Sequence, residues 1–335
     1  MNRRALRKIK WEAGKVKARF GDLFAPFVRN FVRTHVGHEP SNLRPYQVYP
    51  EGGNLNHRFF SEPGAQGKKI IDSSTTISSM GSCFAVEVRN HLRRGNFKFL
   101  DTSNLDESVD WGRVYTTKNM LQIFQYSLGG FSPEIRIVNT GKGFVDAYRE
   151  STSFPSEAEA SEEIRKHTAN SALALKSCEV LILTPGQNEA WVNHKDGHAL
   201  FHQPSAETLA VYGEENFSVK QYSLDDNVQH LRDVLELFAA NNPKAKVIFT
   251  VSPVPSYATF FDANVASRSF ENKAIILLAV KQVVREYPEM TIYFPSFEMA
   301  MLSHNPSMLK DNRHLRLREV EKIMGQFDRE FVINR

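Results

Sequence analysis

The feature that most constrains the fold is a series of five short apolar runs separated by longer stretches of helical periodicity. The runs are rich in β-branched or aromatic residues and end near Gly, Pro or Ser; they cover residues 75–80, 97–101, 180–184, 247–252 and 291–295. Helical patterns follow or precede them at 84–94, 225–241 and 272–287. Strands that alternate with helices predict an α/β fold with a parallel sheet covered on both faces.

In a parallel sheet of this kind, ligands bind beyond the carboxyl ends of the strands. The first run is followed by Gly81-Ser82-Cys83 and then by a helical pattern. Free backbone N–H groups and the dipole at a helix N-terminus favour negative charge, which suits a nucleophile and an oxyanion donor. The alternative is structural: Ser82 as a helix cap and Cys83 as a buried cysteine.

Two further segments predict oxyanion donors. The third run is followed by Gly186 and Asn188, a glycine that permits close approach and a side-chain amide that can donate to an oxyanion; an ordinary Gly-Asn turn is the alternative. Gly112, shortly after the second run, is a candidate for one more backbone donor. The stiff segment 252–255, which contains two prolines, is expected to shape a pocket wall.

Near the C-terminus, Asp311 precedes His314 by three residues. This spacing lets the carboxylate hold the imidazole in one tautomer and stabilise its protonated form, as the acid of a catalytic triad does. A surface Asp-His pair at a helix start is the alternative. A nucleophile after the first strand and an Asp-x-x-His after the last would meet at one edge of the sheet.

Together these motifs resemble the GSCFA family, a branch of the SGNH (GDSL-like) hydrolase superfamily, over residues 74–320. The branch is named after the five letters that stand here from Gly81 to Ala85. The resemblance implies a three-layer α/β/α sandwich with a five-stranded parallel sheet in flavodoxin-like order. It also implies hydrolysis or transfer of acyl esters, often acetyl groups on carbohydrate. Gly186 and Asn188 match the Gly-x-Asn block, with Glu189 where Asp is usual, and Asp311 and His314 match the Asp-x-x-His block.

The first block departs from the superfamily pattern, because Cys83 stands in the place of the nucleophilic serine and Ser82 in the place of aspartate. The register favours Cys83 as the nucleophile, with Ser82 as the alternative. Arg113, Glu189 and Trp191 are candidate contacts for an acylated small molecule or carbohydrate. A rival interpretation is a non-catalytic glycan-binding or scaffolding module of the same fold.

Composition and motif content also bear on the cellular compartment and on cofactors. Two cysteines, Cys83 and Cys178, suit a reducing, cytoplasmic compartment better than a disulfide framework. Neither a Cys-x-x-Cys, nor a His-Glu-x-x-His, nor a glycine-rich phosphate loop occurs, so no metal or other cofactor is expected. His194, His198 and His202 recur every four residues, a spacing that would allow a metal site on one face of a helix. Asp196-Gly197 between them indicates a hairpin turn instead, which argues against that metal site.

The charge of the chain is unevenly distributed. Residues 1–36 hold ten Lys and Arg against two acidic residues, a net charge of +8, and because the whole chain sums to +4 the rest sums to −4. This arm has amphipathic helical periodicity that Pro26 interrupts. It could pack on the chain's own body, dock a protein partner, or hold the protein peripherally at an anionic membrane surface. The acidic body and the lack of recognition motifs argue against nucleic-acid binding.

The predicted organisation therefore has two parts. Residues 1–66 form a basic N-terminal extension and a Pro- and Gly-rich linker, and residues 67–335 form the hydrolase-like domain.

Overall fold

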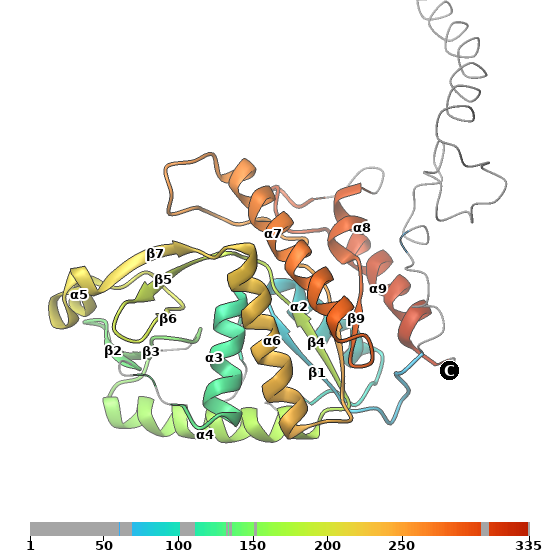
Figure 1. The fold of residues 1–335 in the computed structure, drawn as a ribbon, viewed down its shortest axis with the longest axis horizontal. Helices are drawn as coiled ribbons and strands as arrows, with labels where there is room; N and C mark the ends of the chain where they lie inside the picture. The colour runs from blue at the N-terminus through green and yellow to red at the C-terminus, as the bar shows by residue number, and fades with distance from the viewer. Residues whose placement is uncertain are drawn as a thin grey trace, which may run out of the picture. The chain divides into compact units, whose positions relative to one another are not determined.

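A four-stranded parallel sheet forms the centre of the computed structural model, which describes residue 60 and residues 69–100, 111–131, 133, 136–150, 153–302 and 308–333 (Figure 1). Its order is β1 (Ile77–Gly81), β4 (Val180–Thr184), β8 (Lys246–Phe249) and β9 (Thr291–Tyr293). Four of the five predicted runs therefore form the sheet, and each adjacent pair is parallel as predicted.

The predicted fifth strand is wrong as a full strand. Of the described part of segment 97–101, only Phe99 forms an isolated parallel bridge, to Ile77. The Ile77 N–H donates to Lys98 O at 2.9 Å and the Leu100 N–H donates to Ile77 O at 2.7 Å. This bridge lies on the edge of β1 opposite β4, where a flavodoxin-like order places its second strand. The segment thus occupies the expected position, but its pairing stops after one residue.

Alternating side chains of the sheet pack into two separate apolar layers. In β4, Val180 and Ile182 face one layer while Leu181 and Leu183 face the other, as the two-residue period of a strand requires. The first layer is covered by α2 (Cys83–Arg94) and α9 (Leu317–Phe331) with part of α8 (Ser296–Leu302). The second is covered by α3 (Thr117–Leu128), α4 (Glu157–Ser177), α6 (Leu224–Asn241) and α7 (Val265–Glu286). The three-layer α/β/α architecture is confirmed.

An antiparallel lobe that the sequence did not predict is inserted between β4 and α6 (Figure 1). It contains β5 (Glu189–Asn193), β6 (His198–Ala199) and β7 (Phe217–Gln221), followed along the chain by α6. Beside it lie the hairpin β2 (Ile137–Asn139) and β3 (Phe144–Asp146), α5 (Ala206–Tyr212) and a 3₁₀ turn at Glu214–Asn216. The predicted turn at Asp196-Gly197 is confirmed, since Asn193 pairs with His198 across it.

The basic arm 1–36 and most of the predicted extension 1–66 lie outside the described residues. The chain divides into Met1–Asn54 and a compact unit Leu55–Arg335. The predicted boundary after residue 66 falls among undescribed residues and stays a prediction. Among the helices that the structure describes, none combines the length and the apolar character needed to span a bilayer.

Candidate functional site

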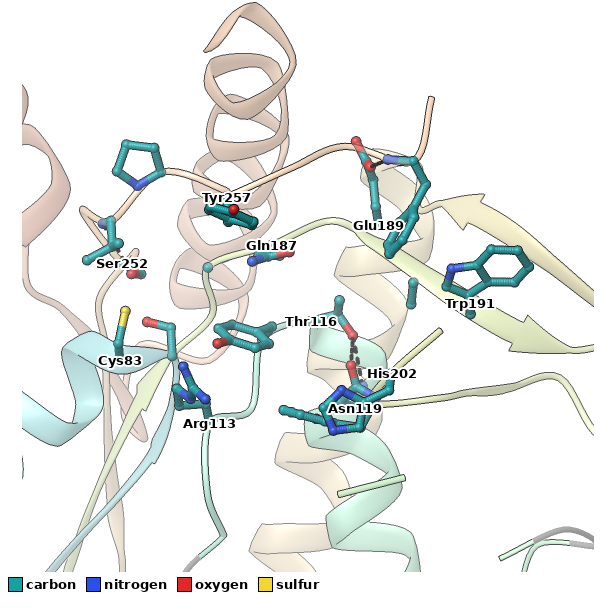
Figure 2. Close-up of a pocket in the computed structure, with 18 of the residues that line it drawn as sticks. Cys83, Arg113, Thr116, Asn119, Gln187, Glu189, Trp191, His202, Ser252 and Tyr257 are labelled. Atoms are coloured by element: carbon teal, nitrogen blue, oxygen red, sulfur yellow. Dashed lines mark hydrogen bonds between the residues drawn. The ribbon is translucent and has the colours of Figure 1, made fainter. Parts of the chain in front are cut away.

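A cavity of about 350 Å³ opens at the carboxyl ends of the parallel strands. Residues that follow β1, β4 and β8 line it, as the position of ligand sites in parallel sheets predicts. The predicted wall segment contributes Ser252, Val254 and Pro255. Cys83 and Arg113 lie at one end of the cavity and Trp191 lies at the other (Figure 2).

The turn from β1 into α2 places Cys83 at the first helical position. Gly81 has a φ of 151°, and any Cβ at this position would overlap Thr184 on the neighbouring strand, so only glycine fits. Ser82 is the N-cap, with its Oγ accepting from Phe84 N–H at 3.3 Å, and is 2% exposed. Cys83 is half-buried and lines the cavity.

Burial and nearby cations act in opposite directions on the Cys83 thiol. Desolvation raises the pKa of Cys83, because a thiolate loses its hydration there. The positive charge of Lys273 lowers this pKa most among the neighbouring groups, followed by that of Arg113. The thiol is therefore the stable form in the absence of a base.

His314 and Asp311 form the predicted pair. Nδ1 of His314 and Oδ2 of Asp311 lie 2.5 Å apart, and both side chains are more than one third exposed. Hydrogen bonds from the His314 side chain and from the backbone N–H of Arg313 and His314 lower the pKa of Asp311 well below its usual range. His314 lines the cavity together with Ser82 and Cys83, and it shares a second, smaller cavity with Cys83.

The structure corrects the predicted oxyanion donors after β4. Asn188 is fully buried and is not among the described residues that line the cavity; its Nδ2 donates to Tyr222 O at 2.6 Å and its Oδ1 accepts from Asn227 at 2.7 Å. Its amide therefore joins the antiparallel lobe to α6. The neighbouring Gln187 lines the cavity instead, with its side chain pointing into it (Figure 2).

The two predicted glycines have different positions. Gly186 lines the cavity, but its N–H donates to Tyr115 O at 2.9 Å; a Cβ at Gly186 would lie 2.9 Å from that of Ser252 and 3.1 Å from that of Ser82. This glycine therefore allows close packing of three strand ends. Gly112 is not part of the cavity lining formed by the described residues, so the geometry does not support its assignment as an oxyanion donor.

The three predicted substrate contacts all line the cavity, but their polar groups differ in the hydrogen bonds they already make within the protein. The guanidinium of Arg113 is bonded to Glu150, with Nε 2.9 Å from Oε1. Glu189 is 8% exposed and its carboxylate accepts from Thr259, Arg268 and Asn272. By contrast, Nε1 of Trp191 is buried without a hydrogen-bond partner in the described part of the chain.

The sequence reasoning missed the contacts from α7 that hold segment 186–189. Arg268 and Asn272 bind the Glu189 carboxylate at 2.9 and 3.0 Å, and Lys273 Nζ donates to Gly186 O at 2.6 Å. Lys273 follows the same period as Ile276, Val280 and Val283 on the buried face of α7. A lysine on this apolar stripe was the available signal.

No cluster of three or more His, Cys, Asp or Glu side chains that could hold a metal ion occurs among the described residues. The chemical groups that meet at the sheet edge include a thiol, a hydroxyl, an Asp-His pair, side-chain amides, and the charged groups of Arg113, Glu189 and Arg313.

These observations define an α/β protein with a three-layer fold and a polar cavity at its strand ends. The chain belongs to the GSCFA family, whose sequence profile matches residues 76–327. The predicted family resemblance is confirmed over nearly the same range. No curated protein matches the chain.

Solved structures with a partly similar arrangement include a GDSL-like lipase from Bacteroides thetaiotaomicron, 13% identical, which covers 80% of this chain and 89% of its own with a TM-score of 0.35. A carbohydrate esterase family 3 protein from Talaromyces cellulolyticus is 10% identical, with coverages of 76% and 94% and a TM-score of 0.35. A catalytic mutant of an acetylxylan esterase from Geobacillus stearothermophilus is 13% identical, with coverages of 79% and 99% and a TM-score of 0.34.

Proposed function

We propose that the protein hydrolyses or transfers acyl esters through a covalent intermediate on Cys83. The observation that carries this proposal is the position of Cys83 and His314 in the lining of one cavity, with Asp311 bound to Nδ1 of the imidazole. Because Nδ1 is occupied, Nε2 is the nitrogen available to accept a proton. A nucleophile, a base and an orienting acid are the groups that acyl transfer requires.

Cys83 suits the nucleophilic role better than Ser82. The Ser82 hydroxyl is almost fully buried and caps α2, whereas the Cys83 side chain is half-buried and borders both cavities that His314 lines. A thiol next to a base is also the more readily activated group. In this proposal Ser82 caps α2, and Cys83 is the nucleophile.

In the proposed reaction, Nε2 of His314 accepts the proton of the Cys83 thiol as Sγ forms a bond to the ester carbonyl carbon. The negative charge moves to the carbonyl oxygen, where the Cys83 N–H and the Gln187 amide are the proposed donors. Collapse breaks the carbon–oxygen bond, and protonated His314 donates its proton to the departing alkoxide. Water then attacks the thioester and releases the acid; an acceptor hydroxyl in its place gives acyl transfer.

The far end of the cavity supports a carbohydrate as the alcohol part of the substrate. Trp191 offers an aromatic surface to the cavity, and Phe260, which also lines the cavity, packs on Trp191 edge-on with the ring centroids 5.8 Å apart. Aromatic walls with a few polar groups are typical of small-molecule sites. An acetylated sugar is therefore the substrate class to test first.

The test compares wild type with Cys83→Ala, Ser82→Ala and His314→Ala on 4-nitrophenyl acetate and on an acetylated sugar. Exposed His194→Ala serves as the matched histidine control. We expect turnover in wild type, Ser82→Ala and His194→Ala, and its loss in the other two variants. Wild-type protein that turns over neither ester would overturn the proposal and favour a binding module.

A further inference from the structure

Lys273 carries a buried amine that forms no ion pair with an Asp or Glu of the described residues. Its side chain is 3% exposed, and Nζ donates to the carbonyl oxygen of Gly186 at 2.6 Å. Within the described ranges, no Asp or Glu lies within ion-pair distance of Nζ. A charge removed from water is costly unless another group compensates it, and burial lowers the pKa of Lys273 to about 7. A group in the candidate site that stabilises the ammonium form of Lys273 is therefore expected.

The position of Lys273 connects it to the nucleophile turn. Gly186, whose carbonyl Lys273 binds, packs so closely on Ser82 that a Cβ would leave only 3.1 Å to the Ser82 Cβ. Cys83 follows directly. Cys83 is also the ionisable group whose charge acts on Lys273, and it raises the pKa of Lys273. Lys273 is thus bonded to a residue that packs on the nucleophile turn, and its charge and that of Cys83 act on each other.

Other charged or titratable groups also surround Cys83. Besides Lys273, the titratable groups that line its two cavities or act on its charge are Glu87, Arg113, Tyr115, Glu189, His202, Tyr257, Arg313 and His314. Glu150 binds Arg113, Asp311 binds His314, and Glu189 is bonded to Arg268. Arg113 is half exposed and is neutralised by Glu150. Lys273 differs because it is shielded from solvent, so its field is screened least.

We infer that Lys273 is a positioning residue that stabilises the thiolate of Cys83 through the protein interior and holds the Gly186 turn against the nucleophile. The inference rests on the proposed function in taking Cys83 as the nucleophile. It also explains why Cys83 reacts in place of Ser82, since a buried ammonium favours the ionised form of a thiol while a hydroxyl stays protonated.

The experiment measures the rate of Cys83 alkylation by iodoacetamide against pH, with the modified peptide quantified by mass spectrometry. Lys273→Gln keeps a donor for Gly186 O but removes the charge, and Lys273→Met removes both. Lys273→Arg keeps the charge, and Lys281→Gln on the same helix is the matched control. Cys178 is expected to remain unalkylated, because burial raises its pKa to about 12.

We expect the alkylation profile of Lys273→Gln and Lys273→Met to move to higher pH by about one unit, which makes Cys83 about tenfold slower near neutrality. Lys273→Arg should retain the wild-type midpoint, and Lys281→Gln should leave the profile unchanged. An unchanged midpoint in folded Lys273→Gln would overturn the inference, even if that variant lost activity, because the role would then be structural.

Thermal unfolding provides the folding check for these variants. Lys273→Met is expected to unfold at a lower temperature than wild type, because it leaves the buried Gly186 carbonyl oxygen without its donor, whereas Lys273→Gln keeps a donor there. Alkylation needs no ester turnover, so the two proposals fail separately. A shifted profile in a protein without esterase activity would overturn only the proposed function, and an unshifted profile in an active enzyme would overturn only this inference.

Discussion

The turn that carries Cys83 is anchored in the central sheet, whereas the loop that carries His314 lies at the surface. Ser82 N–H donates to Thr184 O at 3.1 Å, and the turn is packed between strand ends. The His314 loop is held by backbone contacts within itself, such as Leu309 N–H to His314 O at 2.7 Å, and by an Arg313 bond to Pro255 O at 3.4 Å.

The two proposed catalytic groups are therefore held in different ways. A substitution in the turn should disturb the packed core as well as the proposed chemistry, because the N-cap Ser82 directly precedes the proposed nucleophile Cys83. A substitution in the loop should change the chemistry with little effect on folding, because Asp311 and His314 are more than one third exposed. The predictions below test this contrast, from the largest expected effect to the smallest.

Removing the proposed nucleophile should have the largest effect. We expect Cys83→Ala to lower kcat/KM for 4-nitrophenyl acetate by about 10³-fold or more. Ser82→Ala should keep most activity but lower the free energy of unfolding by about 1 kcal/mol through the lost helix cap. Steady-state kinetics and urea denaturation measure the two effects. The opposite pattern, with activity lost only in Ser82→Ala, would assign the reaction to the serine.

The exposed pair should separate base from orienting acid. We expect His314→Ala to lower kcat by about 10³-fold and Asp311→Asn by a smaller factor of about 10 to 10², because water can partly replace an exposed carboxylate. Both variants should unfold at nearly the wild-type urea concentration. A large loss of stability in either would contradict the view of this loop as separate from the core.

Neighbouring amides after β4 should differ in the kind of damage they cause. Gln187→Ala should lower kcat by about 10²-fold without destabilising the fold, because the side chain lies in the cavity. Asn188→Ala should lower the free energy of unfolding by about 1–3 kcal/mol, because it removes the donor to Tyr222 O and one of the acceptors of the buried Asn227 amide. Equal kcat values for Gln187→Ala and wild type would remove Gln187 from the oxyanion site.

Close packing at Gly186 should be visible in the free energy of unfolding. A Cβ there would meet Ser252 at 2.9 Å, so Gly186→Ala should cost about 1–3 kcal/mol of stability. Gly325→Ala in α9, where the nearest atom is 3.8 Å away, is the control and should stabilise by about 0.5–1 kcal/mol. Equal unfolding midpoints for the two variants would show that the strand ends are loosely packed.

Most of the central fold was predictable from sequence because buried parallel strands are continuous apolar runs, and Val180–Thr184 matches its predicted bounds. Segment 97–101 contains two aromatic residues, which favour strands, but its described part pairs through Phe99 alone. Strand pairing at an edge depends on the neighbouring chain, which composition does not encode. The antiparallel lobe was missed, apart from its turn at Asp196-Gly197, because its strands Glu189–Asn193 and Phe217–Gln221 contain many polar residues.

The site was predicted in outline but not in its details. The order of motifs placed Cys83 and His314 at one sheet edge. It could not decide between Gln187 and Asn188, because adjacent side chains leave a chain in different directions and only the packing against Tyr222 and α6 settles which is buried. Lys273 escaped notice because the residue it contacts, Gly186, lies 87 positions away in the sequence.

The central claim is tested most directly by trapping the acyl-enzyme. Wild-type protein is mixed with an activated acetyl ester, quenched in acid, digested and mapped by mass spectrometry. The account predicts a single acetyl group on Cys83, which neutral hydroxylamine releases as it does a thioester. More of this adduct is expected when the reaction is quenched early than after all the ester has been consumed. An acetyl group on Ser82, or none on the chain while the ester is still consumed, would contradict it.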